Sequence, residues 1–245
     1  ESVLRESRDP SEHPNLHDKL ESLYRKKEDW TSVVDILQRA GRIAVSATLQ
    51  RDKMFEAAEI YTEVLNAPDE AISVYKEVLE TLGWESSCAH LLANLFEVTE
   101  RYEELASLIE ETARQADSEE ERDALKLRLA DIYNNGTKQQ TEAINLLVSL
   151  LPSDHVSDDA VDYLIALASE KSVKATIRNG VIEELTRHFD TAGNASRKAD
   201  IHLMRLSSSR SATKRSQLLL EAGGSSRLVI TWSTRPYALA SSPEK

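Results

Sequence analysis

The sequence predicts an all-α protein: a solenoid of about five stacked antiparallel helix hairpins, with a further C-terminal helix or helices and a loose tail. Two observations predict this fold class. Residues 55–83 have the pattern of one helix hairpin, and the pattern recurs along the chain. Within residues 55–83, apolar residues stand at helical spacing on both sides of Pro68. Pro68 disfavours a helical conformation in Ala67 but is tolerated in the first turn of a new helix, so we expect two helices that meet there.

One aromatic residue anchors each unit of the recurrence, with apolar residues four and one positions before it. The anchors Tyr24, Tyr61, Phe96 and Tyr133, followed by a weaker Ala168, lie 37, 35, 37 and 35 residues apart. A period of about 20–50 residues is typical of solenoids, in which each unit covers the apolar face of its neighbour. Each anchor aromatic removed from water should contribute about 1.5–3 kcal/mol to folding.

The elements follow in order along the chain. Residues 1–15 are polar and are predicted to be a linker, and the repeat domain is predicted to cover residues 16–190. Gly83 is expected to end a helix, Ser118 and Glu121 to form a capping box, and Asn135-Gly136 to form a turn. Residues 191–222 are predicted to form a basic helical extension, and residues 223–245 a disordered tail. The helices are expected at about 16–28, 30–45, 48–66, 68–82, 85–99, 102–116, 119–134, 138–151, 157–171 and 175–190.

Charge and composition limit the function classes. The chain carries a net charge of -12, which divides into -18 over residues 1–190 and +6 over residues 191–235. An acidic body of this size repels nucleic acid and anionic membranes. The single cysteine, Cys88, excludes an internal disulfide and is expected to be a packing residue. No apolar run approaches the roughly 20 residues that span a bilayer, and no signal peptide is recognisable, so we expect a cytoplasmic protein without a membrane segment.

The sequence contains none of the common catalytic or metal-binding motifs. There is no phosphate-binding glycine loop, no CxxC pair, no HExxH and no GxSxG. His13 and His17 are four residues apart, but Pro14 lies between them and no third ligand completes a zinc site. The acidic cluster at residues 117–121 is explained as a helix start. We therefore expect a protein that is not an enzyme and has no metal, no cofactor and no small-molecule substrate.

Three units carry a more specific pattern: Ala57-Ala58-x-x-Tyr61 with Ala71-x-x-x-Tyr75, Leu92-Ala93-x-x-Phe96, and Leu129-Ala130-x-x-Tyr133 with Ala143-x-x-x-Leu147. In this the chain resembles tetratricopeptide repeat (TPR) arrays over about residues 16–190. The resemblance implies a right-handed solenoid whose first helices line a concave groove. Glu21 and Ala168 depart from the pattern in the first and last units, which suits the water-facing ends of a stack.

The resemblance also implies a binding surface, because particular positions around each anchor face the groove in TPR arrays. A partner segment with Lys or Arg beside an apolar anchor would suit the acidic positions and Phe55. The alternative is that these residues are simply solvated. The clamp that some TPR arrays use for chaperone C-termini is disfavoured, since Glu59, His90 and Glu97 stand where cations are needed. The groove positions are Asp18, Ser22, Arg25, Lys26, Phe55, Glu59, Thr62, Glu63, His90, Asn94, Glu97, Val98, Leu127, Asp131, Asn134 and Asn135.

The leading hypothesis is a non-catalytic scaffold that binds a peptide or helix of another protein, through a basic or amphipathic segment of that partner. The alternative is RNA binding or processing through the basic, serine-rich residues 197–227, with the repeats as a spacer. A third hypothesis is regulatory: the basic tail folds onto the acidic body and competes with the partner.

Overall fold

The computed structural model describes residues 14–153 and 155–191, together with residues 197, 201, 204 and 205. The described part is helical and contains no strand, which confirms the all-α prediction. Helix ends fall within a few residues of the predicted ones, although the first helix begins at Pro14, inside the expected linker. The rest of that linker and the predicted tail at residues 223–245 lie outside the described residues. The helices are α2 (Pro14–Lys26), α3 (Trp30–Ile43), α4 (Ala47–Glu63), α5 (Pro68–Leu82), α6 (Ser86–Val98), α7 (Tyr102–Gln115), α8 (Glu119–Asp131), the π-helical η2 (Ile132–Gly136), α9 (Gln140–Leu150), α10 (Asp158–Ser169) and α11 (Ala175–Thr191).

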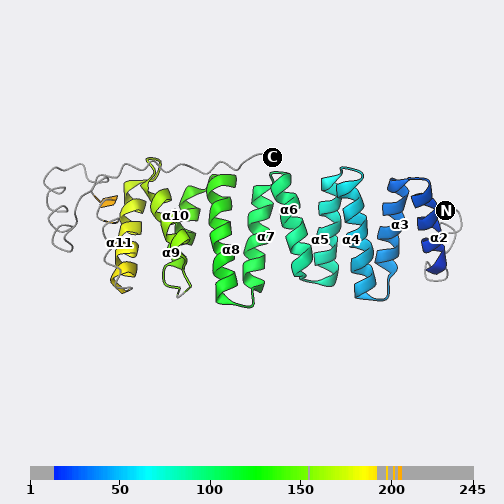
Figure 1. Cartoon of the computed structure of the whole chain (residues 1–245), viewed down its shortest axis with the longest axis horizontal. Helices are drawn as coiled ribbons and strands as arrows, with labels where there is room; N and C mark the ends of the chain where they lie inside the picture. The colour runs from blue at the N-terminus through cyan, green and yellow to red at the C-terminus, as the bar shows by residue number, and fades with distance from the viewer. Residues whose placement is uncertain (1–13, 154, 192–196, 198–200, 202–203, 206–245) are drawn as a thin grey trace. The chain divides into compact units, whose positions relative to one another are not determined.

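The chain divides into two compact units, residues 1–150 with 154–160 and residues 151–153 with 161–245. In the described part of the first unit, helices α2 to α9 lie side by side in chain order, each packed against the next (Figure 1). The anchor Phe96 is buried, whereas Tyr24, Tyr61 and Tyr133 are half-buried against the same clusters of apolar side chains. Phe96 therefore lies in the core, as the sequence pattern predicts, and the three tyrosines pack against the core from its edge.

A recurring turn joins the two helices of each hairpin in the first unit. Its first mark is a non-glycine residue with positive φ: Glu28 (56°), Asn66 (49°), Glu100 (56°) and Lys138 (61°). Its second mark is that the next N–H donates to the carbonyl of the unit's anchor aromatic. The distances are 3.0 Å from Asp29 to Tyr24, 2.8 Å from Ala67 to Tyr61, 2.8 Å from Arg101 to Phe96 and 2.6 Å from Gln139 to Tyr133. The sequence repeat is thus also a repeat of backbone geometry.

The second and fourth turns contain one residue more than the first and third. The last turn of the preceding helix is wider in these two units and accommodates that residue. The N–H of Leu65 donates to the carbonyl of Ile60, and that of Thr137 to Ile132, both at 3.0 Å and both spanning five residues instead of four. In the fourth unit the widened turn is the π-helical η2. The prediction of a turn at Asn135-Gly136 is therefore wrong: these residues still belong to the helix, and the turn follows them.

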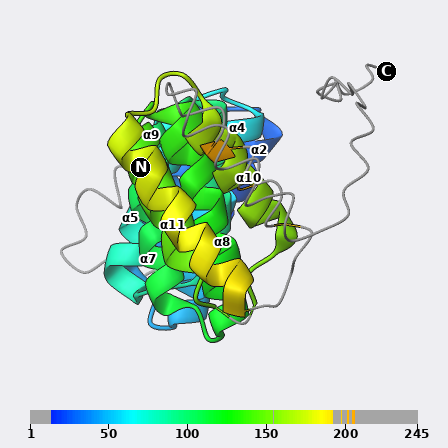
Figure 2. The same ribbon diagram turned by 90° about the vertical axis from the view of Figure 1, so that its left-hand side faces the viewer.

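The second unit is built around α11 and most of α10, with Leu164, Leu167, Leu185 and Phe189 buried (α11 is yellow in Figure 2). The guanidinium of Arg178 closes the connection between these helices by donating to the carbonyls of Ala168 (2.9 Å), Glu170 (2.7 Å) and Val173 (3.1 Å).

Five residues of the predicted basic extension are described: Thr191 at the end of α11, and residues 197, 201, 204 and 205. All five are helical. Ile201 and Met204 are buried, Arg197 forms an ion pair with Asp162, and Arg205 donates to the Thr186 hydroxyl at 3.1 Å. This part of the extension therefore contributes apolar side chains to the core of the second unit.

Candidate functional site

Ion pairs connect the first helices of successive hairpins. Lys53 Nζ on α4 lies 2.8 Å from Glu21 Oε2 on α2. Arg128 Nη2 on α8 lies 3.0 Å from Glu97 Oε1 on α6. Helices that are two apart in the chain are therefore neighbours in space, and α2, α4, α6 and α8 form a first-helix layer.

The second helices are joined in the same way. Arg42 on α3 holds the carboxylate of Glu77 on α5 with two nitrogens, at 2.7 and 2.8 Å. Lys76 Nζ on α5 lies 3.1 Å from Glu104 Oε1 on α7. We call α3, α5 and α7 the second-helix layer. Figure 2, which looks along the row of helices, has α5 and α7 on one side and α2 and α4 on the other.

The four groove positions predicted in the first unit come together on the first-helix layer. Asp18, Ser22, Arg25 and Lys26 line a hollow of about 510 Å³ with Glu21 and Lys53. Its floor is an ionic network, since Glu21 accepts from Arg25 (2.9 Å) and Lys53 (2.8 Å). Burial raises the pKa of Glu21, but the hydrogen bonds from Lys53 and Arg25 outweigh burial, and the pKa falls below its usual value. The hollow is lined by polar residues, and the charges of Glu21, Arg25 and Lys53 largely compensate one another.

Several middle positions of the predicted groove are already engaged. The ring of Phe55 is half-buried and meets Tyr75 edge to face, with centroids 5.3 Å apart, so Phe55 is a core residue more than a free anchor. Thr62 donates to the Ala58 carbonyl at 2.7 Å, and Glu97 is paired with Arg128.

Other middle positions are open to solvent. Glu59 and Glu63, one turn apart on α4, form no ion pair with any residue that the structure describes. His90 and Asn94 are exposed one turn apart on α6, and Val98 on the same helix is 81% exposed. In the middle of the predicted face, these five residues are available to a partner.

Three of the predicted groove positions in the fourth unit form side-chain hydrogen bonds with one another. Asn135 donates to Asp131 at 2.6 Å, and Asn134 donates to Asn135 at 3.1 Å. Asn134 and Asn135 lie in η2, so the widened turn changes their direction relative to the equivalent residues of a regular helix. Leu127 is half-buried.

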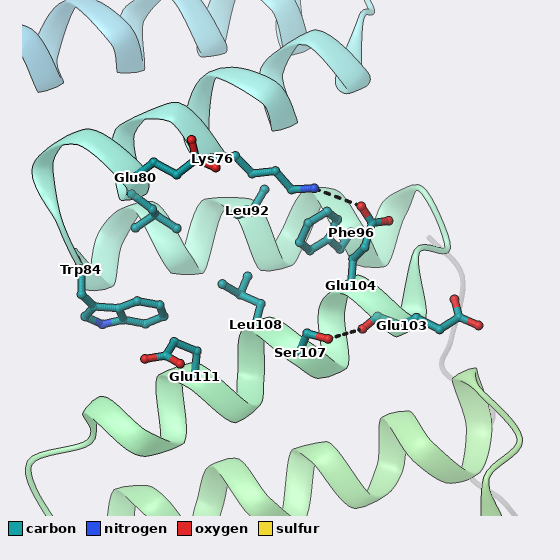
Figure 3. Close-up of a pocket in the computed structure, with 11 residues that line it drawn as sticks. Lys76, Glu80, Trp84, Leu92, Phe96, Glu103, Glu104, Ser107, Leu108 and Glu111 are labelled. Atoms are coloured by element: carbon teal, nitrogen blue, oxygen red, sulfur yellow. Dashed lines mark hydrogen bonds and ion pairs between the residues drawn. The ribbon is translucent and has the colours of Figure 1, made fainter.

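A second surface, which the sequence did not reveal, lies on the second-helix layer. We call it the α5–α7 groove; it has a volume of about 440 Å³ (Figure 3). Its floor is apolar, with Leu92 and Phe96 from α6 below and Trp84 at one end. Carboxylates stand along both sides. The lining residues are Lys76, Leu79, Glu80, Trp84, Leu92, Phe96, Glu103, Glu104, Ser107, Leu108 and Glu111.

The rim of the α5–α7 groove has an excess of negative charge, with four glutamates and one lysine. Lys76 is held in place by Glu104, and its Nζ lies 5.3 Å from the centre of the Phe96 ring. Glu80 and Glu103 are exposed and form no ion pair within the described part of the chain. Glu111 is paired with Arg114 on its outer side at 2.7 Å.

The described residues offer no reactive centre that we can recognise. No three His, Cys, Asp or Glu side chains among them gather in a way that could hold a metal ion. Cys88 is fully buried, with Sγ 3.4 Å from the Tyr75 carbonyl. Burial, with a smaller contribution from Glu85, raises the pKa of its thiol to about 12, so a thiolate nucleophile is not formed at neutral pH.

Comparison with protein-family models gives no match, and comparison with curated proteins gives none either. Among the helices in the described part of the chain, none combines the length and the apolar character that crossing a bilayer requires. The residues themselves therefore carry the functional argument.

Proposed function

We propose that this chain is a non-catalytic protein-interaction scaffold: a TPR-like, right-handed α-solenoid that binds a peptide or helix of a partner protein on its first-helix layer. The recurring turn is the observation that carries the proposal. Four turns with the same backbone geometry and the same bond to the anchor carbonyl indicate four copies of one hairpin. Stacked copies of one hairpin are the construction of solenoids, which use their extended faces for binding.

The ion pairs between alternate helices support the stacked arrangement. Pairs such as Lys53 with Glu21 and Arg42 with Glu77 join equivalent helices of adjacent hairpins. Exposed pairs of this kind contribute only about 0–1 kcal/mol each. These ion pairs are informative about geometry, because they can form only if adjacent hairpins present the same face on the same side.

The open residues on the first-helix layer suggest the chemistry of the partner. Glu59 and Glu63 form no ion pair with any described residue, and Val98 is an exposed apolar side chain on the next first helix. A partner segment with Lys or Arg beside an apolar side chain would complement both features.

The RNA-binding alternative gains nothing from the described residues. It depends on the cations of residues 197–227, and of these Arg197 and Arg205 are engaged with Asp162 and Thr186. The remainder of that segment, and the tail invoked in the regulatory hypothesis, lie outside the described residues.

Titration with peptide pools tests the proposal. The full chain is titrated with fluorescent peptides that carry Lys or Arg beside one apolar residue, and with matched peptides in which Glu replaces the cations. We expect binding of the cationic pool only, weakened roughly tenfold by Glu59→Lys with Glu63→Lys. The control is Glu183→Lys with Asp190→Lys on α11, which makes the same change in charge at exposed positions. Indifference to both pools, or equal loss in both variants, would refute the proposed face.

A further inference from the structure

The α5–α7 groove lies on the layer opposite to the face proposed above. Its floor is apolar, unlike that of the first-helix hollow, and its rim carries an excess of carboxylates, of which Glu80 and Glu103 form no ion pair within the described part of the chain. We propose that this groove binds a cationic amphipathic segment of a partner protein, with a bulky apolar side chain on the floor and Lys or Arg on the rim. The inference rests on the proposed function and adds a second surface to it.

The floor argues for an apolar side chain. Leu92 and Phe96 are 2% exposed and form the base, while Leu79 and Trp84 are only half-buried. In Figure 3 the indole of Trp84 and the side chain of Leu108 face the same open space. A hollow of about 440 Å³ with such a lining falls within the range of pockets that bind ligands. An apolar side chain placed there would cover the open edge of Trp84.

The rim argues for cations. Lys76 already shows how the groove holds an ammonium group: its Nζ lies 3.1 Å from Glu104 Oε1 and 5.3 Å from the centre of the Phe96 ring. Glu80 on α5 and Glu103 on α7 offer two further carboxylates with no cation opposite them in the described part of the chain.

The same charges argue against other occupants. Nucleic acid and anionic lipid would meet the carboxylates of Glu80, Glu103 and Glu111 with like charge. An uncharged apolar segment would leave those carboxylates partly desolvated without a counter-charge, which is unfavourable. Charge complementarity therefore selects a basic amphipathic segment.

A position-specific assay tests the groove. The full chain contains three tryptophans, so labelling with 5-fluorotryptophan gives one ¹⁹F resonance each for Trp30, Trp84 and Trp232. The Trp84→Phe variant assigns the Trp84 resonance. The probe is a fluorescent peptide of Leu and Lys in an amphipathic pattern. Its two controls replace every Lys by Glu or every Leu by Ser.

We expect the Leu–Lys peptide, and neither control peptide, to shift the Trp84 resonance while leaving that of Trp30 in place. Reversal of charge by Glu80→Lys with Glu103→Lys should weaken binding roughly tenfold, because two attractive exposed pairs are replaced by repulsive ones. Glu183→Lys with Asp190→Lys should change the affinity less than about twofold. Unchanged far-UV circular dichroism shows that both variants are folded.

Other outcomes would overturn the inference in distinguishable ways. If the peptide binds without shifting Trp84 and is weakened by Glu59→Lys with Glu63→Lys, the groove is not the site, although the proposed function stands. If the groove variant binds as tightly as the wild-type chain, the rim does not recognise the cations. If the peptide does not bind, the groove assignment is wrong, and the peptide-pool titration decides the proposed function separately.

Discussion

Gly136 is the position where a single added methyl group should be most informative about the packing of the repeats. It lies in η2, against the ring of Tyr102 at the start of α7. A Cβ on Gly136 would stand 2.6 Å from Cγ, 2.7 Å from Cδ1 and 2.9 Å from Cβ of Tyr102. Favourable carbon contacts are at about 3.5–4.0 Å, so the ring or the π-helical turn must move by about an ångström in Gly136→Ala.

The expected cost follows from two opposing effects. Overpacking costs about 1–3 kcal/mol. Replacing Gly by Ala gains about 0.4–1 kcal/mol by restricting the unfolded chain. The clash should prevail, because all three close atoms lie at the root of the Tyr102 side chain and cannot swing away as a flexible tip could. We expect Gly136→Ala to lower the free energy of unfolding by roughly 1–2 kcal/mol, measured by urea denaturation followed by circular dichroism.

Two controls separate the clash from the general effect of alanine. Gly180 on α11 has open space where its Cβ would stand, so Gly180→Ala should stabilise by about 0.4–1 kcal/mol. Tyr102→Ala removes two of the three close atoms, so the cost of Gly136→Ala should shrink in that background by about 1 kcal/mol. A Gly136→Ala protein as stable as wild type, or a cost unchanged by Tyr102→Ala, would refute the reasoning.

Three further predictions concern chemistry and backbone. Cys88, with its pKa raised to about 12 by burial, should resist iodoacetamide at pH 8 in the folded protein and react quickly in urea; rapid native alkylation would contradict its burial. Glu100, at φ 56°, should tolerate Gly with a gain of up to about 1 kcal/mol in unfolding free energy, whereas Ala124→Gly within α8 should cost about 1 kcal/mol; equal effects of the two changes would argue against the turn geometry. The hydrogen bond from Arg42 lowers the pKa of Glu77 below 4.5, so its stabilisation is complete above that pH and lost as pH falls through the lowered pKa. Between pH 5 and pH 3 the free energy of unfolding should therefore fall by about 0.3–1 kcal/mol more in the wild-type protein than in Glu77→Gln. Urea denaturation at each pH measures both decreases, and equal decreases would exclude this contribution.

The features that the sequence predicted are those with local causes. Pro68 begins α5, Gly83 ends it with φ 85°, and the Ser118 hydroxyl accepts from the Glu121 N–H at 3.1 Å at the start of α8. Each depends on residues a few positions apart, so a single sequence contains the information. The same holds for the buried anchor Phe96, because helical periodicity assigns it to an apolar face.

The features that the sequence did not predict depend on neighbours far along the chain. The resemblance to TPR arrays assigns Phe55 to the open face through its spacing from Tyr61, but its large ring reaches the next helix and meets Tyr75. The α5–α7 groove requires α7 to lie beside α5, with Trp84 from the intervening connection at one end. The pairing of Glu97 with Arg128 is likewise set by how hairpins stack. Periodicity within one helix contains none of this information.

Site-specific photo-crosslinking tests the central claim, that the first-helix layer and the α5–α7 groove of this chain bind another protein. A photoreactive amino acid would replace Glu59 on the first-helix layer, Glu103 in the α5–α7 groove, or Glu183 on α11 as the control. The three full-length variants are irradiated with an equimolar mixture of the cationic and acidic peptides described above, and attached polypeptides are identified by mass spectrometry. The account predicts that a cationic peptide is attached at positions 59 and 103 and is absent at position 183. Attachment of no polypeptide at positions 59 and 103, or equal attachment at all three positions, would contradict it.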